Sequence, residues 1–240
     1  MKFAEILKRK SSDNYGNRPP VIAFLGDSIT QGCFEFEKKG PTVRVAFDGC
    51  EAYSEKVKKI LGILYPMAPV TIVNTGISGS SAPIGAQRME RDILSANPDL
   101  LVVCFGLNDS TRDMEGLEDY KNALSQIFKQ AKEAGIETIF MTPNMMNTYT
   151  SAILELEGHR TLAEETARLQ NEGVLDAYVD AAKEICKSEG VAVCDCYATW
   201  KRMYRQGVDT TALLSNGINH PIRELHYLFA WELVNTILGE

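Results

Sequence analysis

Five short apolar runs alternate with longer amphipathic segments, and this alternation restricts the fold of the 240-residue chain more than any other feature. The apolar runs lie at residues 21–25, 70–74, 100–106, 137–142 and 191–195. The clearest helical spacing occurs at residues 52–64, 117–135, 175–190 and 223–238. Continuous apolar runs of this length are typical of parallel strands buried on both faces. The sequence therefore predicts an α/β fold, a doubly wound parallel sheet with helices on both faces.

The chain shows no internal repeat, low-complexity tract or long linker that would divide it. We therefore expect a single domain over residues 1–240, in which residues 1–19 form an N-terminal helix and lead-in. Two stretches, 31–50 and 143–158, fit the alternation poorly and are interpreted as long connections. Such connections either cover a site or decorate the surface.

Charge and cysteine usage restrict the partners. The formal net charge of −7 argues against nucleic acid, because phosphate binding requires clustered Lys and Arg. The N-terminal segment lacks the apolar core of a secretory signal, and no stretch is long enough to span a membrane. The six scattered cysteines suggest reduced thiols, so we expect a cytoplasmic protein. Cys194 and Cys196 have no second cysteine pair or histidine nearby in sequence, so no metal is expected there.

Candidate chemical groups follow the predicted strands. Ser28 comes just after the first strand, Gly79 after the second and Asn108 after the third, while His220 precedes the last helix. In an open parallel sheet, ligands bind outside the carboxyl ends of the strands. Each residue by itself is explained as an ordinary turn, cap or surface residue. Their common placement instead predicts one site.

These residue types match the needs of acyl transfer. The reaction requires a hydroxyl nucleophile, a base that takes its proton, and hydrogen-bond donors aimed at the oxyanion. Ser28 supplies the hydroxyl and His220 the base. Gly79 allows its backbone N–H to approach a reacting carbonyl closely, and the Asn108 amide is a second donor.

With these residues in place, the sequence resembles the SGNH or GDSL hydrolases. The resemblance rests on four separated blocks: FLGDSITQG (24–32), NTGISGSS (74–81), GLND (106–109) and NGINHP (216–221). It implies a flavodoxin-like three-layer α/β/α sandwich with a five-stranded parallel sheet.

The resemblance also implies a serine esterase. Ser28 matches the nucleophile and His220 the base. The oxyanion hole is expected from the Ser28 and Gly79 backbone N–H groups and the Asn108 amide, with Asp27 as a supporting residue. The implied reaction needs no cofactor.

The match fails at one position. Family members carry an aspartate three residues before the histidine, and here that residue is Gly217, preceded by Asn216. Three arrangements remain open. Asn216 accepts a hydrogen bond from the imidazole, a backbone carbonyl orients His220 in a Ser–His dyad, or a carboxylate such as Asp209 or Glu224 reaches the ring. We favour a dyad or an Asn216-assisted triad.

The substrate is specified less sharply. We expect Phe34, Met145 and Met146 to line an apolar pocket, with ordinary loop packing as the alternative. The preferred function is hydrolysis of short-chain acyl esters, acetyl esters of carbohydrates foremost. A lysophospholipase or thioesterase and a catalytically silent binding protein are the alternatives. The expected partner is a small-molecule ester, and the sequence leaves a homo-oligomer open.

Overall fold

The central element is a five-stranded sheet in which every strand is parallel to its neighbours. The structure, a computed structural model, describes residues 2–39 and 42–239. The strand order is β4-β1-β5-β6-β7. All five predicted strands are confirmed: β1 Val21–Gly26, β4 Thr71–Asn74, β5 Leu100–Cys104, β6 Glu137–Met141 and β7 Ala192–Cys194.

The winding of the chain reverses at β1, which lies between β4 and β5. Such a switch point is where ligands bind in open α/β sheets. The register pairs Phe24 with Asn74 and Gly26 with Cys104. The segments that follow these three strands therefore leave the sheet side by side at its carboxyl edge.

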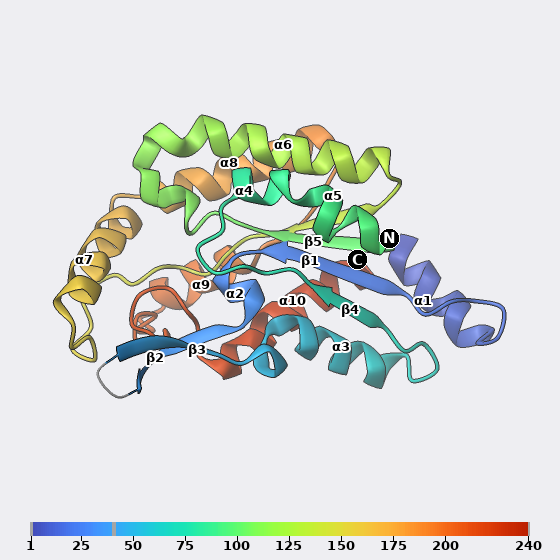
Figure 1. Cartoon of the computed structure of the whole chain (residues 1–240), viewed down its shortest axis with the longest axis horizontal. Coiled ribbons are helices and arrows are strands. Elements are labelled where there is room, and N and C mark those ends of the chain that lie inside the picture. The colour runs from blue at the N-terminus through green and yellow to red at the C-terminus, as the bar shows by residue number, and fades with distance from the viewer. Residues whose placement is uncertain (1, 40–41, 240) are drawn as a thin grey trace.

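Helices cover both faces of the sheet (Figure 1), as predicted. One layer holds α4 Ala82–Gln87, α5 Met89–Asp92, α6 Leu117–Glu133 and α8 Val174–Glu189. The other holds α1 Lys2–Ser12, α3 Tyr53–Leu64, α9 Cys196–Arg205 and α10 His226–Leu238. Short 3₁₀ turns are η1 Gly49–Glu51, η2 Leu94–Ala96, η3 Asp109–Gly116 and η4 Arg223–Leu225. Within the described residues, no helix is long and apolar enough to cross a bilayer.

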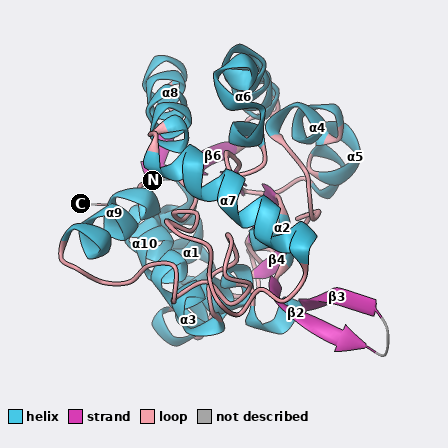
Figure 2. Ribbon diagram, turned by 90° about the vertical axis from the view of Figure 1, so that its left-hand side faces the viewer, coloured by secondary structure: helices cyan, strands magenta, loops and turns pink. Residues whose placement is uncertain are grey.

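The carboxyl edge of the sheet carries its own elements. Figure 2 looks onto this edge and shows α2 Ser28–Gln31, α7 Glu157–Asn171 and a hairpin of β2 Cys33–Lys39 and β3 Thr42–Phe47. The long connection predicted over 31–50 is thus mostly an antiparallel hairpin, while residues 40–41 lie outside the described part. Alternation of apolar and polar residues in CFEFEKK and TVRVAF was the available signal.

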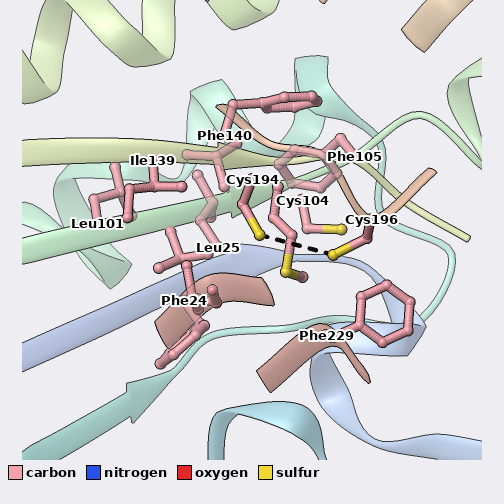
Figure 3. Close-up of a cluster of buried hydrophobic side chains, with 14 of the residues drawn as sticks. Phe24, Leu25, Leu101, Cys104, Phe105, Ile139, Phe140, Cys194, Cys196 and Phe229 are labelled. Carbon is pink, nitrogen blue, oxygen red and sulfur yellow. Dashed lines mark hydrogen bonds between the residues drawn. The ribbon is translucent and has the colours of Figure 1, made fainter. Parts of the chain in front are cut away.

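The core lies between the sheet and its helices. Phe24, Leu101, Phe140 and Phe229 pack there with several buried cysteines (Figure 3). Every cysteine in the described residues is free, and the Cys194 and Cys196 sulfurs lie 3.7 Å apart. Burial raises the pKa of the Cys104 and Cys196 thiols well above the usual value, which disfavours the reactive thiolate.

Candidate active site

Ser28 lies where β1 gives way to a single-turn helix. Asp27 caps this helix, and its Oδ1 accepts a hydrogen bond of 2.9 Å from the backbone N–H of Ile29. Ser28 is the first helical residue, so its own N–H has no acceptor within the helix. Burial raises the pKa of the Asp27 carboxyl to about 7, and the nearby Asp109 adds to the shift. The turn chemistry of Gly-Asp-Ser therefore fixes a hydroxyl and a backbone donor at the strand end.

The segment after β4 lies directly against this helix. A Cβ atom on Gly76 would lie 2.3 Å from the backbone N of Gln31, so only glycine allows the approach. The Gln31 side chain also accepts a 2.7 Å hydrogen bond from the N–H of Ser78. Gly79 follows in the left-handed region, with φ of +76° and open space where a Cβ would lie. Its backbone is exposed, as an oxyanion donor requires.

Asn108 reaches the same loop from the end of β5. Its Nδ2 donates a 2.9 Å hydrogen bond to the Ser80 carbonyl, which uses one of its two N–H groups. The neighbouring Asp109 is buried and accepts N–H groups from Ala82 at 2.8 Å and from Gly106 at 3.0 Å. Asp109 thus joins the segments after β4 and β5, a role that the sequence analysis missed although the residue lies in the GLND block.

Arg88 ties the segment after β4 to the end of β1. Its Nη2 donates to the Gly26 carbonyl at 2.9 Å, and its Nη1 donates to the Thr75 carbonyl at 2.5 Å and to Asp92 at 2.9 Å. The side chain is only 6% exposed. A buried guanidinium requires such partners because an unpaired charge is costly to bury. Arg88 lies in none of the sequence motifs, so its role was not predicted.

His220 lies in hydrogen-bond contact with Ser28. Its Nε2 is 3.0 Å from the Ser28 Oγ, and its Nδ1 is 2.8 Å from the backbone carbonyl of Phe34. A carbonyl oxygen only accepts, so Nδ1 carries the proton and Nε2 is free to accept from the serine hydroxyl. Burial lowers the pKa of the imidazole, although the Phe34 hydrogen bond opposes the shift. The ring is therefore neutral and in the tautomer that a general base needs.

The structure does not give Asn216 the contact that we predicted. Its Oδ1 accepts backbone N–H groups from Ile218 at 3.0 Å and from Asn219 and His220 at 2.9 Å. This oxygen shapes the loop that carries His220 and does not contact the imidazole. The reason is local, because a buried turn must pair its own N–H groups first.

The position of the family aspartate does not accept a side chain easily. Gly217 has φ of +67°, and a Cβ there would lie 3.1 Å from Ser151 Cβ and 3.2 Å from Ile153. Neither Asp209 nor Glu224 orients the ring in place of that aspartate, since neither contacts the imidazole in the described structure. Asp209, for example, accepts from the Tyr149 hydroxyl at 2.7 Å. Of the three arrangements, the contact present at the imidazole Nδ1 is the one with a backbone carbonyl, that of Phe34.

The predicted apolar pocket is wrong in its residues. Phe34, Met145 and Met146 are no more than 1% exposed and pack in the interior, so they offer no surface to a ligand. The loop after β6 instead forms hydrogen bonds with the loop that carries His220. The Asn144 Nδ2 donates to the Asn219 carbonyl, and the Asn147 N–H donates to the Ile218 carbonyl, both at 2.8 Å.

Two cavities lie near the site residues. One, of about 270 Å³, lies beside Gly79 and Asn108 and is also lined by Ser81, Thr111 and Arg112. The other, of about 290 Å³, lies between the hairpin and the loop before α7, where its lining is mostly apolar and includes Phe36, Val43, Ile153, Leu154 and Leu156.

The other two histidines have structural contacts. His226 is fully buried, its Nδ1 accepts the Tyr53 N–H at 3.1 Å, and burial lowers its pKa to about 3. His159 is half-buried and stacks on Phe36 with ring centroids 3.9 Å apart.

Comparison with known proteins identifies the class that this geometry suggests. The sequence profile of the GDSL-like Lipase/Acylhydrolase family matches residues 24–227. The chain therefore belongs to this family of carboxylic ester hydrolases, and the resemblance inferred from the four blocks is confirmed.

An acetylxylan esterase of Geobacillus stearothermophilus is 28% identical over 131 residues, which are 51% of this chain and 58% of that protein. The chain thus aligns with little more than half of this relative. The solved structure of Axe2, an acetylxylan esterase from the same organism, has a TM-score of 0.68 at 22% identity and covers 92% of this chain and 95% of that one. A two-domain esterase active on acetylated mannans has a TM-score of 0.68 at 17% identity, covering 98% of this chain and 52% of that one. These structures share the fold.

Proposed function

We propose that the protein is a serine esterase that removes short acyl groups, acetyl foremost, from carbohydrates, and that residues 1–240 form one hydrolase domain. The observation that carries this proposal is the line of hydrogen bonds from the Ser28 hydroxyl through His220 to the Phe34 carbonyl, at 3.0 and 2.8 Å. The chain therefore holds a nucleophile, a neutral base and an acceptor that keeps the base in the required tautomer.

The proposed reaction starts with proton transfer. The His220 Nε2 takes the Ser28 proton as the hydroxyl oxygen attacks the ester carbonyl. The resulting oxyanion accepts hydrogen bonds from the Ser28 and Gly79 backbone N–H groups and from the second N–H of the Asn108 amide. His220 then protonates the leaving alcohol, and water hydrolyses the acyl-enzyme with His220 again as base.

The Phe34 carbonyl takes the place of the missing aspartate in this scheme. It orients the ring but has only a partial negative charge, so it stabilises the imidazolium less than a carboxylate does. In serine proteases, replacing the triad aspartate by asparagine lowers turnover by about 10⁴-fold, largely through the wrong tautomer. A carbonyl acceptor avoids that part of the loss, since it fixes Nδ1 as the donor.

Two observations support a carbohydrate ester. The cavity beside Gly79 and Asn108 is lined by hydroxyl, amide and guanidinium groups, which match a hydroxyl-rich substrate. The relatives described above include esterases whose descriptions name acetylated xylan and mannan. The apolar cavity beside Phe36 favours a second candidate, a lysophospholipase or thioesterase with a longer acyl chain.

Hydrolysis assays with the wild type and Ser28→Ala test the proposal. We expect acetyl esters of p-nitrophenol and of xylose oligomers to be cleaved by the wild type and not by Ser28→Ala. Rates that rise toward octanoyl esters and lysophospholipids would favour the second candidate. A wild type no faster than Ser28→Ala on every ester would instead indicate a catalytically silent binding protein.

A further inference from the structure

We propose that Arg223 is a positioning residue whose ion pair with Glu35 holds the Phe34 carbonyl against His220, so that this carbonyl can orient the imidazole in place of the missing triad aspartate. This inference rests on the proposed esterase function. A backbone carbonyl is positioned only by the segment that carries it. The segment that carries Phe34 must therefore be anchored.

The Phe34 carbonyl lies in a β-bulge. The β2–β3 ladder pairs Cys33 with Phe47 and next pairs Phe36 with Val45, so Phe34 and Glu35 together oppose Ala46 alone. A bulge of this kind leaves a residue outside the regular pairing and redirects its groups, and bulges recur beside active sites. The bulge frees the Phe34 carbonyl from the hairpin so that it accepts from His220. The same feature removes the ladder contacts that would otherwise hold it.

Arg223 supplies the replacement contacts. Its Nη1 and Nη2 bind the two Glu35 carboxylate oxygens at 2.7 and 3.1 Å, and its Nε lies 3.5 Å from the Asp48 carboxylate. The guanidinium carbon lies 4.3 Å from the centre of the Phe34 ring. A fork-to-fork pair of this type fixes orientation as well as distance. Arg223 thus contacts both residues of the bulge and Asp48, the residue directly after β3.

Arg223 also follows His220 by only three residues, in the turn η4. His220 and Arg223, which holds the carbonyl that accepts from His220, therefore belong to one short segment. A change in the position of the hairpin relative to this segment would alter the Nδ1-to-carbonyl distance directly. The Phe34 ring packs in addition against the buried His226, with centroids 4.9 Å apart, which holds the bulge from within the core. The ion pair itself is about one-third exposed, so we expect it to act more on geometry than on global stability.

The experiment compares kcat and KM of the wild type, Arg223→Ala, Arg223→Lys, Glu35→Ala and the Arg223→Ala/Glu35→Ala double variant on p-nitrophenyl acetate. Arg18→Ala is the matched control, because it removes a 2.7 Å ion pair with Asp99 that lies beside β1 at its amino end. Assays are run well below the melting temperature of each variant, and each variant is checked by circular dichroism. If Arg223→Ala does not fold, Glu35→Gln, which keeps the shape but not the charge, replaces it.

We expect Arg223→Ala and Glu35→Ala each to lower kcat by about 10- to 100-fold, as misplaced catalytic groups do, with little change in KM. Arg223→Lys should fall between the wild type and Arg223→Ala. The double variant should lose no more than the worse single variant, because both changes break one contact. Arg18→Ala should match the wild type.

The proposal is overturned if Arg223→Ala and Glu35→Ala keep kcat within about twofold of the wild type, or if KM rises while kcat does not change. Ser28→Ala separates this failure from failure of the proposed function. If the wild type is active, Ser28→Ala is inactive and the Arg223 and Glu35 variants are unaffected, only the proposed role of Arg223 is refuted. If the wild type is as inactive as Ser28→Ala, the proposed esterase function is refuted.

Discussion

The two halves of the candidate site are built in different ways. The half that carries Ser28, Gly79 and Asn108 comes from the ends of adjacent parallel strands and is held by the buried Arg88, which is 6% exposed. The half that carries His220 comes from a loop and a bulged hairpin outside the sheet, and is held by Arg223, which is 33% exposed. The sheet edge thus fixes the proposed nucleophile and oxyanion donors rigidly. The proposed base depends on contacts between two irregular segments.

Loss of the base is expected to have the largest effect. His220→Ala should lower kcat on acetyl esters by about 10⁴-fold or more, because no other group in the described site takes the Ser28 proton. Steady-state kinetics with p-nitrophenyl acetate measure this. His159→Ala is the control, since His159 stacks on Phe36 and does not contact Ser28. A His220→Ala variant within tenfold of the wild type would contradict the dyad.

On the sheet side, Asn108→Ala should lower kcat by about 10²- to 10³-fold, the usual effect of removing one oxyanion donor. KM should change little, since the donor acts mainly on the charge that develops in the transition state. Asn108→Asp is a useful companion, because it keeps the size but replaces the donor by a negative acceptor. Activity of Asn108→Asp equal to that of the wild type would exclude Asn108 from the oxyanion hole.

Introducing the family aspartate at position 217 should not improve catalysis by His220. In Gly217→Asp, the left-handed φ of +67° and the contacts with Ser151 and Ile153 should lower the free energy of unfolding by about 1–2 kcal/mol or more. We expect no gain in kcat, because the Phe34 carbonyl already occupies Nδ1. Gly217→Ala has the same backbone strain without the carboxylate. A tenfold faster Gly217→Asp than Gly217→Ala would show that the loop rearranges to form a triad.

The pH dependence should be the smallest effect. Burial lowers the pKa of His220 from 6.5, so the imidazole stays neutral and able to accept a proton as the pH falls toward that value. Activity should therefore be constant from pH 8 to 7 and fall by no more than about twofold at pH 6.5.

The buried Asp27 has a pKa raised to about 7 and titrates in the same range. Asp27→Asn keeps the oxygen that caps Ile29 and removes this titration, which makes it the matched control for the pH profile. A wild-type midpoint above pH 7 that persists in Asp27→Asn would contradict a depressed His220 pKa.

The difference between the halves also explains which parts of the site were predictable. Ser28, Gly79 and Asn108 follow strands with a clear apolar pattern, so sequence order alone predicted that they would lie at one edge. The interpretation of Met145 and Met146 as pocket residues failed, because apolar residues in a loop do not reveal whether the loop is buried. Asp109 and Arg88 were missed because their roles are contacts with backbone groups distant in sequence.

The amino-acid pattern was enough to predict the five strands, the helices near 52–64, 117–135, 175–190 and 223–238, the family and the four residues of the proposed chemistry, whereas α4, α5 and α7 were not predicted. The predicted features depend on local periodicity and on motifs whose spacing reflects strand ends. The contact that orients His220 could be found only in the folded protein. The acceptor is a backbone carbonyl, which every residue has, and only the bulge at Phe34 and the Arg223–Glu35 pair distinguish this one from the others.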